Sequence, residues 1–172
     1  MKEKIFAVVV ALAIVVMIGY TAMIVRPAAA QTDGVSFEIS HHHVAISVPN
    51  VEESVAWYKK MFGFEVVLRM TQGANNEMVV THIKRGNCYI ELFQVAGAKP
   101  LPEYRRDPTA DLRVHGFKHM AFQVSDVLAA TKELRAKGAE IAMEPVDTPG
   151  IAFVFIRDNA GNAFELIQYK KQ

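Results

Sequence analysis

An internal repeat constrains the fold more than any other feature of these 172 residues. Residues 43–51 (His-Val-Ala-Ile-Ser-Val-Pro-Asn-Val) align with residues 119–127 (His-Met-Ala-Phe-Gln-Val-Ser-Asp-Val), 76 residues further on. Residues 91–94 (Glu-Leu-Phe-Gln) align with residues 165–168 (Glu-Leu-Ile-Gln) at a shift of 74 residues. Two matches at nearly one spacing indicate two copies of a module, which is too few for a solenoid. The sequence therefore predicts a domain built from paired modules.

Each copy has the pattern of a strand, a helix and three strands. Val44, Ile46 and Val48 alternate with polar or small residues, which is strand periodicity. Asn50 is the expected helix N-cap of the first copy, and Gly63 is its expected C-terminal stop. Asp126 and Gly138 have these roles in the second copy. The strands expected from the sequence span 64–70, 78–84 and 88–95 in the first copy, and 117–124, 140–143, 151–156 and 163–169 in the second. The pattern predicts an α+β fold of two tandem βαβββ modules.

The chain divides into a short N-terminal part and one domain. We expect the domain over residues 41–170, with modules at about 41–95 and 116–170 and a tether at 31–40. The stretch between the modules, residues 96–115, contains Pro100, Pro102 and Pro108 and is expected to be a connector.

Residues 1–30 have the pattern of an export signal. Lys2 and Lys4 precede an apolar run over 5–25, and an Ala-rich exit follows, with Ala30 the expected last residue of the signal. The run is also long enough for an uncleaved membrane anchor, and a mis-assigned start codon is the third interpretation. A signal or an anchor places the domain outside the cytoplasm, periplasmic, secreted or held at the membrane through this segment.

Charge and cysteine content exclude several classes of site. The formal net charge is +1 and the charges are mixed along the chain, so no basic block indicates a nucleic-acid partner. Cys88 is the single cysteine, which excludes an intramolecular disulfide and a cysteine-based zinc site.

Two histidines and two glutamates occupy matching places in the two modules. Because Val44, Ile46 and Val48 must face the helix, the strand alternation turns His43 to the other face, and the same argument applies to His119. Ile90 and Leu92 likewise leave Glu91 on the far face of the last strand, as Phe164 and Leu166 leave Glu165. A single histidine or glutamate on a strand is usually structural or solvated. The symmetry of all four, however, predicts a divalent metal site of His43, Glu91, His119 and Glu165 if the modules close around a common concavity.

The remaining histidines and cations are given ordinary structural roles. His41 and His42 are expected to be structural, with His42 facing the helix side, and His115 to lie at the surface. His82 could face either side of its strand. Four strand-borne cations are expected to form solvated rims: Arg69, Lys84, Lys118 and Arg157.

These residues resemble the vicinal oxygen chelate superfamily, which includes glyoxalase I, methylmalonyl-CoA epimerase, extradiol dioxygenases and antibiotic resistance proteins. The resemblance runs from about His42 to Tyr169. It is carried by residues 43–48 (His-Val-Ala-Ile-Ser-Val), Trp57-Tyr58, residues 90–92 (Ile-Glu-Leu), residues 119–122 (His-Met-Ala-Phe) and residues 158–166 (Asp-Asn-Ala-Gly-Asn-Ala-Phe-Glu-Leu). It implies a curved, cup-like mixed sheet around the metal and a homodimer, with the modules paired within one chain or exchanged between two.

The metal positions of the family fall on His43, Glu91, His119 and Glu165, a set closest to that of glyoxalase I. The resemblance implies one divalent ion (Zn, Ni, Co, Mn or Fe) and a lyase or isomerase acting on a small oxygenated substrate. Glu165 is then the expected base, and Glu91 is a ligand that can exchange with substrate. Glutathione and CoA adducts are mainly cytosolic, which conflicts with the predicted export.

Two other functions remain open at this point. An Fe(II) extradiol-type dioxygenase would use His43, His119 and Glu165, but Glu91 would fill a coordination position that oxygen chemistry needs open. A resistance-type protein would bind a small molecule without turning it over, and the complete ligand set argues against it.

Overall fold

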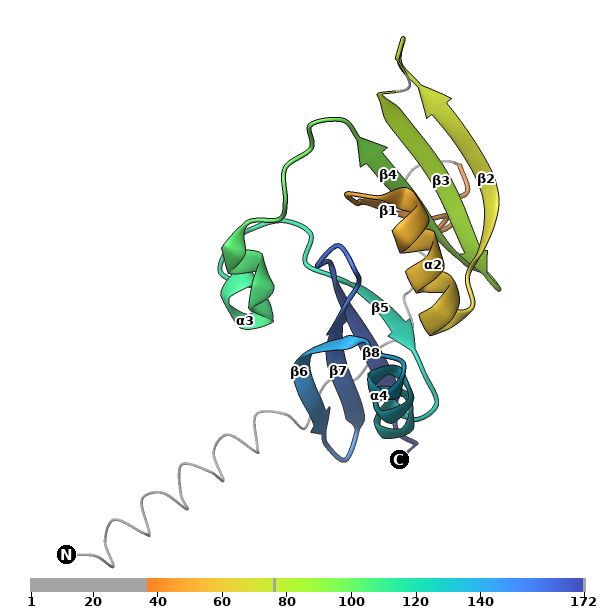
Figure 1. Cartoon of the computed structure of the whole chain (residues 1–172). Helices are drawn as coiled ribbons and strands as arrows, with labels where there is room; N and C mark the ends of the chain where they lie inside the picture. Colours follow the sequence, from red (N-terminus) through yellow and green to blue (C-terminus); the bar gives the residue numbers. More distant parts are fainter. Residues whose placement is uncertain (1–36, 76, 172) are drawn as a thin grey trace, which may run out of the picture. The chain divides into compact units, whose positions relative to one another are not determined.

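The computed structural model describes residues 37–75 and 77–171 (Figure 1). The predictions for residues 1–30 and for most of the tether lie outside these residues. The chain divides into the unit Met1–Ser40 and the unit His41–Gln172, and the second unit contains both modules. Within the described residues, no helix has the length and apolar character needed to cross a membrane.

Both modules have the predicted order of strand, helix and three strands. The first consists of β1 (Val44–Ser47), α2 (Val51–Phe62), β2 (Glu65–Gln72), β3 (Met78–Arg85) and β4 (Cys88–Val95). The second consists of β5 (Met120–Gln123), α4 (Val127–Ala136), β6 (Glu140–Asp147), β7 (Ile151–Arg157) and β8 (Ala163–Tyr169). The connector carries the short helices η1 (Glu103–Arg106) and α3 (Pro108–Asp111). The predicted α+β fold of two βαβββ modules is confirmed.

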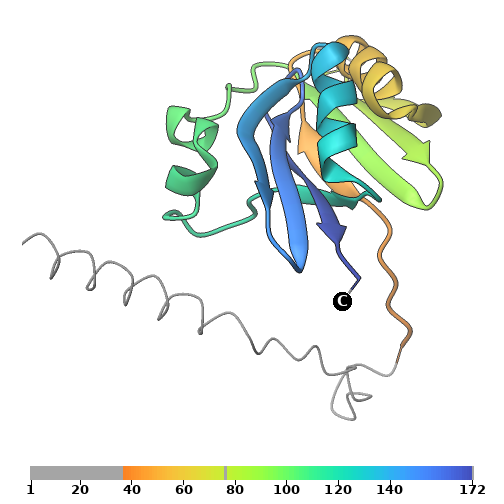
Figure 2. The ribbon, with the colours of Figure 1, turned by 90° about the horizontal axis from the view of Figure 1, so that it is seen from below.

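Each module forms its own four-stranded mixed sheet. Sheet A has the order β1-β4-β3-β2 and sheet B the order β5-β8-β7-β6. In both, the first and last strands of the module pair in parallel, and the other pairs are antiparallel. Figure 2 shows the two sheets with α2 and α4 beside them. No strand pairing joins sheet A to sheet B among the described residues, so a single chain does not form one continuous cup-like sheet.

The helices begin and end where the sequence predicts, for identifiable local reasons. The Asn50 side chain accepts hydrogen bonds from the backbone N–H groups of Glu52 and Glu53, and Gly63 ends α2 in the left-handed region at φ 70°. Asp126 caps α4 by accepting from the Ala129 N–H. These side chains satisfy N–H groups that have no partner inside the helix.

The repeated glutamine also has a local role. Gln94 Oε1 accepts from the backbone N–H of Val51 at 2.8 Å, and Gln168 Oε1 accepts from that of Val127 at 3.1 Å. Each glutamine thus connects the last strand of its module to the first turn of its helix, which accounts for its recurrence beside Glu91 and Glu165.

Two strand boundaries differ from the prediction by more than two residues. β5 begins at Met120 rather than at residue 117, because Arg105 Nη2 donates to the carbonyls of Phe117 and Lys118 at 3.1 and 3.3 Å. Those carbonyls are therefore used by the connector. β6 continues past residue 143 to Asp147 through a register shift that contains Pro145, which an edge strand tolerates.

One hydrophobic core joins the modules on the helix side of both sheets. The Phe62 ring on α2 lies 5.4 Å from the ring of Phe122, and the Tyr58 ring lies 5.7 Å from that of Phe164. Tyr58 is fully buried and donates its hydroxyl to Asp158 Oδ2 at 2.9 Å. Burial, reinforced by the Asp158 carboxylate, raises the pKa of Tyr58 well above its ordinary value. The modules are thus tied by apolar contact and by one buried polar contact.

Candidate metal centre

His43 and Glu91 form the first half of the candidate site, on sheet A. Glu91 lies on β4 opposite Ala45 in the parallel register, and His43 immediately precedes β1. His43 Nε2 lies 3.3 Å from Glu91 Oε2, and their side chains are 32% and 16% exposed. The two donor atoms are therefore close together and open to solvent on one side.

His119 and Glu165 form the second half, on sheet B. Glu165 lies opposite Ala121 in the same parallel register, and His119 immediately precedes β5. His119 Nε2 lies 3.2 Å from Glu165 Oε2, with side-chain exposures of 29% and 16%. The sequence symmetry is thus reproduced in the geometry, and each module places one imidazole nitrogen beside one carboxylate oxygen.

The spacing within each pair fits a shared cation. Adjacent donors about 2.1 Å from one metal ion lie about 3.0–3.4 Å apart, from the octahedral to the tetrahedral arrangement. The observed separations of 3.3 and 3.2 Å fall in this interval. Imidazole and carboxylate together suit Zn, Fe, Ni, Co or Mn. Each pair is therefore suited to supply two ligands.

The two pairs do not meet within one chain. Phe122 and Phe164 lie in the core that joins the modules, and strand alternation turns His119 and Glu165 to the opposite face of sheet B. The same alternation turns His43 and Glu91 away from that core on sheet A. Among the described residues, no group of three or more His, Cys, Asp or Glu side chains is arranged to hold a metal ion. The four-ligand centre therefore remains a prediction, and one chain presents it as two separate half-sites.

His82 is the functional candidate that the sequence left undecided. Its Nε2 lies 2.9 Å from Glu91 Oε1, and its ring centroid is 5.4 Å from that of His43. Alternation could not place it, because β3 is apolar on both faces, with Met78 and Val80 on one and Val79 and Ile83 on the other. The pairing of β3 with β4 decides the face, since His82 lies directly opposite Glu91.

The other histidines lie outside the two pairs, although His42 Nδ1 lies 2.7 Å from His43 Nδ1. His41 and His115 are exposed. His42 is also exposed, and its ring stacks on that of Tyr89 at 5.2 Å, so the expectation that it faces the helix is wrong. Tyr89 lies two residues before Glu91 on β4 and therefore shares its face.

The connector covers the face of sheet B beside His119. A hollow of about 190 Å³ lies there, lined by His119, Phe153 and Phe155 from one side and by Pro108 and Leu112 of the connector from the other. This apolar hollow could hold a small substrate next to the second half-site.

Two of the four cations expected at a solvated rim instead form hydrogen bonds with the connector. Lys118 Nζ donates to the carbonyl of Asp111 at 2.6 Å and to that of Val114. Arg157 is 4% exposed and donates to the carbonyls of Arg106 and Gly161. Arg69 instead pairs with Glu52, and Lys84 lies over the Tyr89 ring. None of these four side chains is therefore left free to contact a CoA phosphate.

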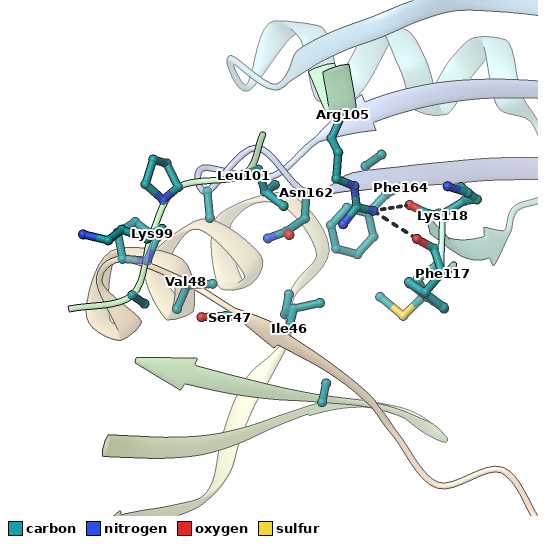
Figure 3. A pocket seen from close by; sticks show the side chains of 17 residues that line it. Ile46, Ser47, Val48, Lys99, Leu101, Arg105, Phe117, Lys118, Asn162 and Phe164 are labelled. Atoms are coloured by element: carbon teal, nitrogen blue, oxygen red, sulfur yellow. Dashed lines mark hydrogen bonds between the residues drawn. The ribbon is translucent and has the colours of Figure 1, made fainter. Parts of the chain in front are cut away.

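A larger hollow lies between β1, the connector and β8. It measures about 430 Å³, and Figure 3 shows Ile46 and Val48 on one side, with Leu101, Asn162 and Phe164 across from them. Neither histidine–glutamate pair lines it. It lies at the junction of the modules and is not part of the candidate metal site.

Comparisons with known proteins agree with this architecture. The family model described as the Glyoxalase/Bleomycin resistance protein/Dioxygenase superfamily matches residues 40–166. An uncharacterised protein of Bacillus subtilis, YwkD, is 32% identical over 122 residues, which cover 69% of this chain and 88% of that protein. An ethylmalonyl-CoA/methylmalonyl-CoA epimerase of Cereibacter sphaeroides is 31% identical over 101 residues, covering 58% and 72% of the two chains. The crystal structure of a glyoxalase family protein from Enterococcus faecalis superposes with a TM-score of 0.62 at 25% identity, covering 74% and 96%.

Proposed function

Because the chain belongs to the glyoxalase, bleomycin resistance protein and dioxygenase superfamily, we propose that it is a divalent-metal-dependent lyase or isomerase of glyoxalase type. Its substrate is a small oxygenated molecule, and its reaction is a proton transfer next to a carbonyl group. The observation that carries the proposal is the duplicated pair, His43 with Glu91 and His119 with Glu165, at 3.3 and 3.2 Å. A protein that bound a small molecule without metal would not need this arrangement twice.

The complete site is proposed to form between two copies of the chain. Both half-sites face away from the core that joins the modules, so bringing them together within one chain would separate Tyr58 from Asp158 and Phe62 from Phe122. A second copy can instead bring its own half-site to each free face. A symmetric homodimer then contains two identical sites, each made from one half of each type.

The side chains divide the chemistry between them. A bound divalent cation would stabilise negative charge on substrate oxygens and thereby make the neighbouring C–H bond more acidic. Glu165 takes that proton as a carboxylate and returns it to a neighbouring atom, so no oxidant or reductant is needed. His43, His119 and Glu91 hold the cation. The apolar hollow beside His119 excludes water from the reacting atoms.

The relatives support this class of reaction. The Cereibacter protein is by its name an epimerase of CoA thioesters, which is an isomerase. The hollow beside His119 measures only about 190 Å³, so the proposed substrate is smaller than a CoA thioester. The proposed export of the chain, which rests on residues 1–30, agrees with a substrate found outside the cytoplasm.

Metal content tests the proposal first. The full-length protein is purified untagged and without chelator, and its metals are measured by elemental analysis. About one Zn, Ni, Co or Mn per chain is expected, with loss in His43→Ala and retention in His115→Ala, an exposed control. No metal after reconstitution would contradict the proposal. Iron that is lost on exposure to oxygen would favour the extradiol dioxygenase.

Subunit complementation tests the shared site. His43→Ala damages the first half-site and His119→Ala the second, so each homodimer contains no intact site. In a mixed dimer with exchanged halves, one site receives both damaged halves and the other receives two intact ones. Mixing the two variants should therefore restore metal binding, whereas a site closed within one chain would gain nothing from mixing.

A further inference from the structure

We propose that His82 positions Glu91 and restricts it to binding the metal through a single oxygen, Oε2. This inference rests on the proposed metal site and assigns a role to a residue outside the four ligands. His82 holds the other oxygen, Oε1, and thereby makes Glu91 a fixed ligand rather than a base.

The geometry gives the two oxygens of Glu91 different environments. His82 Nε2 lies 2.9 Å from Oε1, which is a hydrogen bond donated by the Nε2–H group to the carboxylate. Oε2 is the oxygen beside His43, at 3.3 Å. The His82 and Glu91 side chains are 14% and 16% exposed, so solvent competes little for this bond.

The contact is set by the backbone. His82 on β3 and Glu91 on β4 are direct partners in the antiparallel register, which places their Cβ atoms close together on one face of sheet A. The residue that lies opposite Glu165 in the same register of sheet B is Phe155. Phe155 cannot donate a hydrogen bond, and its ring lies edge-on to His119 at 4.9 Å.

The two carboxylates are therefore not equivalent. Within residues 37–75 and 77–171, no side chain donates a hydrogen bond to Glu165 Oε1. That oxygen is free to take a proton, whereas Oε1 of Glu91 already accepts one hydrogen bond. A carboxylate held in this way loses less conformational freedom when it binds a metal, and partners of this kind typically raise metal affinity by about 10–100-fold.

Metal affinity of matched variants tests the inference. Zn²⁺ affinity is measured by competition with a chromogenic chelator for the full-length wild type, His82→Phe, His82→Gln and His115→Ala. His82→Phe reproduces the environment of Glu165 and should weaken binding about 10-fold or more. His82→Gln keeps an N–H donor at similar reach and should restore most of the affinity. His115→Ala, which removes an exposed histidine outside both pairs, should leave affinity within about twofold.

A second measurement concerns the metal-free protein. In ¹⁵N-edited NMR spectra, His82 should show a slowly exchanging Nε2–H proton, and that signal should be lost or shifted in Glu91→Ala. Equal affinity in His82→Phe and wild type, or equal weakening in His82→Phe and His82→Gln, would overturn the inference while the metal site stands. Failure of the wild type to bind Zn²⁺ would instead overturn the proposed function and this inference together.

Discussion

The two modules share their backbone pattern but differ at the residue opposite the candidate carboxylate. In sheet A this residue is His82, which hydrogen-bonds to Glu91, and in sheet B it is Phe155, which leaves one oxygen of Glu165 without such a partner. Both modules keep the histidine–glutamate pair at nearly the same distance. The positions that match between the modules therefore supply the proposed metal ligands. The position that differs, His82 in one module and Phe155 in the other, makes Glu91 hydrogen-bonded and leaves Glu165 without that bond.

A second difference lies in the helices. Tyr58 on α2 donates a buried hydrogen bond to Asp158, and the residue 76 positions later on α4 is Leu134, which lies in the core without any polar group. Within the described residues, the second module thus has no counterpart of the Tyr58–Asp158 hydrogen bond at the matching helix position. The following predictions test these differences between the modules, from the largest expected effect to the smallest.

The two glutamates should respond differently to the same substitution. Glu165→Gln should lower kcat about 10²–10⁴-fold at saturating metal, because the base is removed, and should weaken metal binding less than Glu91→Gln does. Rates are measured on the substrate identified by screening hemithioacetals, with metal affinity measured in parallel. A larger loss of kcat in Glu91→Gln at saturating metal would reverse the two assignments.

Loss of the Tyr58 hydroxyl should destabilise the domain. Tyr58→Phe removes a buried hydrogen bond to the Asp158 carboxylate, so the free energy of unfolding should fall by about 1.5–3 kcal/mol, as measured by urea denaturation. Tyr169→Phe is the control, because that side chain is 65% exposed and should change stability little. Equal effects of the two substitutions would show that the link between the modules is apolar only.

The same tyrosine predicts a stability loss at high pH. The pKa of Tyr58 is raised in the folded protein, so above pH about 10 the unfolded chain loses the phenol proton while the folded protein keeps it. The contribution of Tyr58 to the free energy of unfolding should therefore be constant below that pH. Above it, the free energy of unfolding should fall by at most about 1.4 kcal/mol per pH unit. The difference between wild type and Tyr58→Phe, followed by urea denaturation from pH 8 to 11, isolates this contribution; a difference independent of pH would contradict it.

The helix caps should differ slightly. Asn50 accepts from two backbone N–H groups and donates to Glu53 at 3.0 Å, whereas Asp126 accepts from one N–H group. Asn50→Ala and Asp126→Ala should each cost about 0.5–2 kcal/mol, with the larger loss for Asn50. Thermal unfolding of the two variants compares them directly, and a larger loss for Asp126 would be the contrary result.

Local structure and the ligand pairs could be predicted from the sequence because they depend on neighbouring residues. The alternation of Val44, Ile46 and Val48, the caps at Asn50 and Asp126 and the repeat itself specified two βαβββ modules. The same alternation placed each histidine and glutamate on one face of its sheet. These features follow from periods of two and 3.6 residues and from side chains that bond within their own turn.

Features that depend on distant partners could not be predicted. The face of His82 depends on the pairing of β3 with β4, because both faces of β3 are apolar. The late start of β5 depends on Arg105, 12 residues before Phe117, which binds its carbonyl. The arrangement of the modules depends on the contacts of Tyr58 and Phe62 with residues of the other module. Periodicity contains no information on any of these contacts.

The hydrogen bond from His82 to Glu91 has a stereochemical consequence. Inversion of a carbon centre that keeps a fixed orientation in the site requires two bases, one on each side, because the proton leaves from one side and returns to the other. With Glu91 held by His82 and Glu165 free, the proposed site has one base, which must remove and return the proton on the same side. The reaction expected from this geometry is a suprafacial shift of hydrogen between neighbouring atoms, as in the conversion of a hemithioacetal to a hydroxythioester, and the product would have a single configuration.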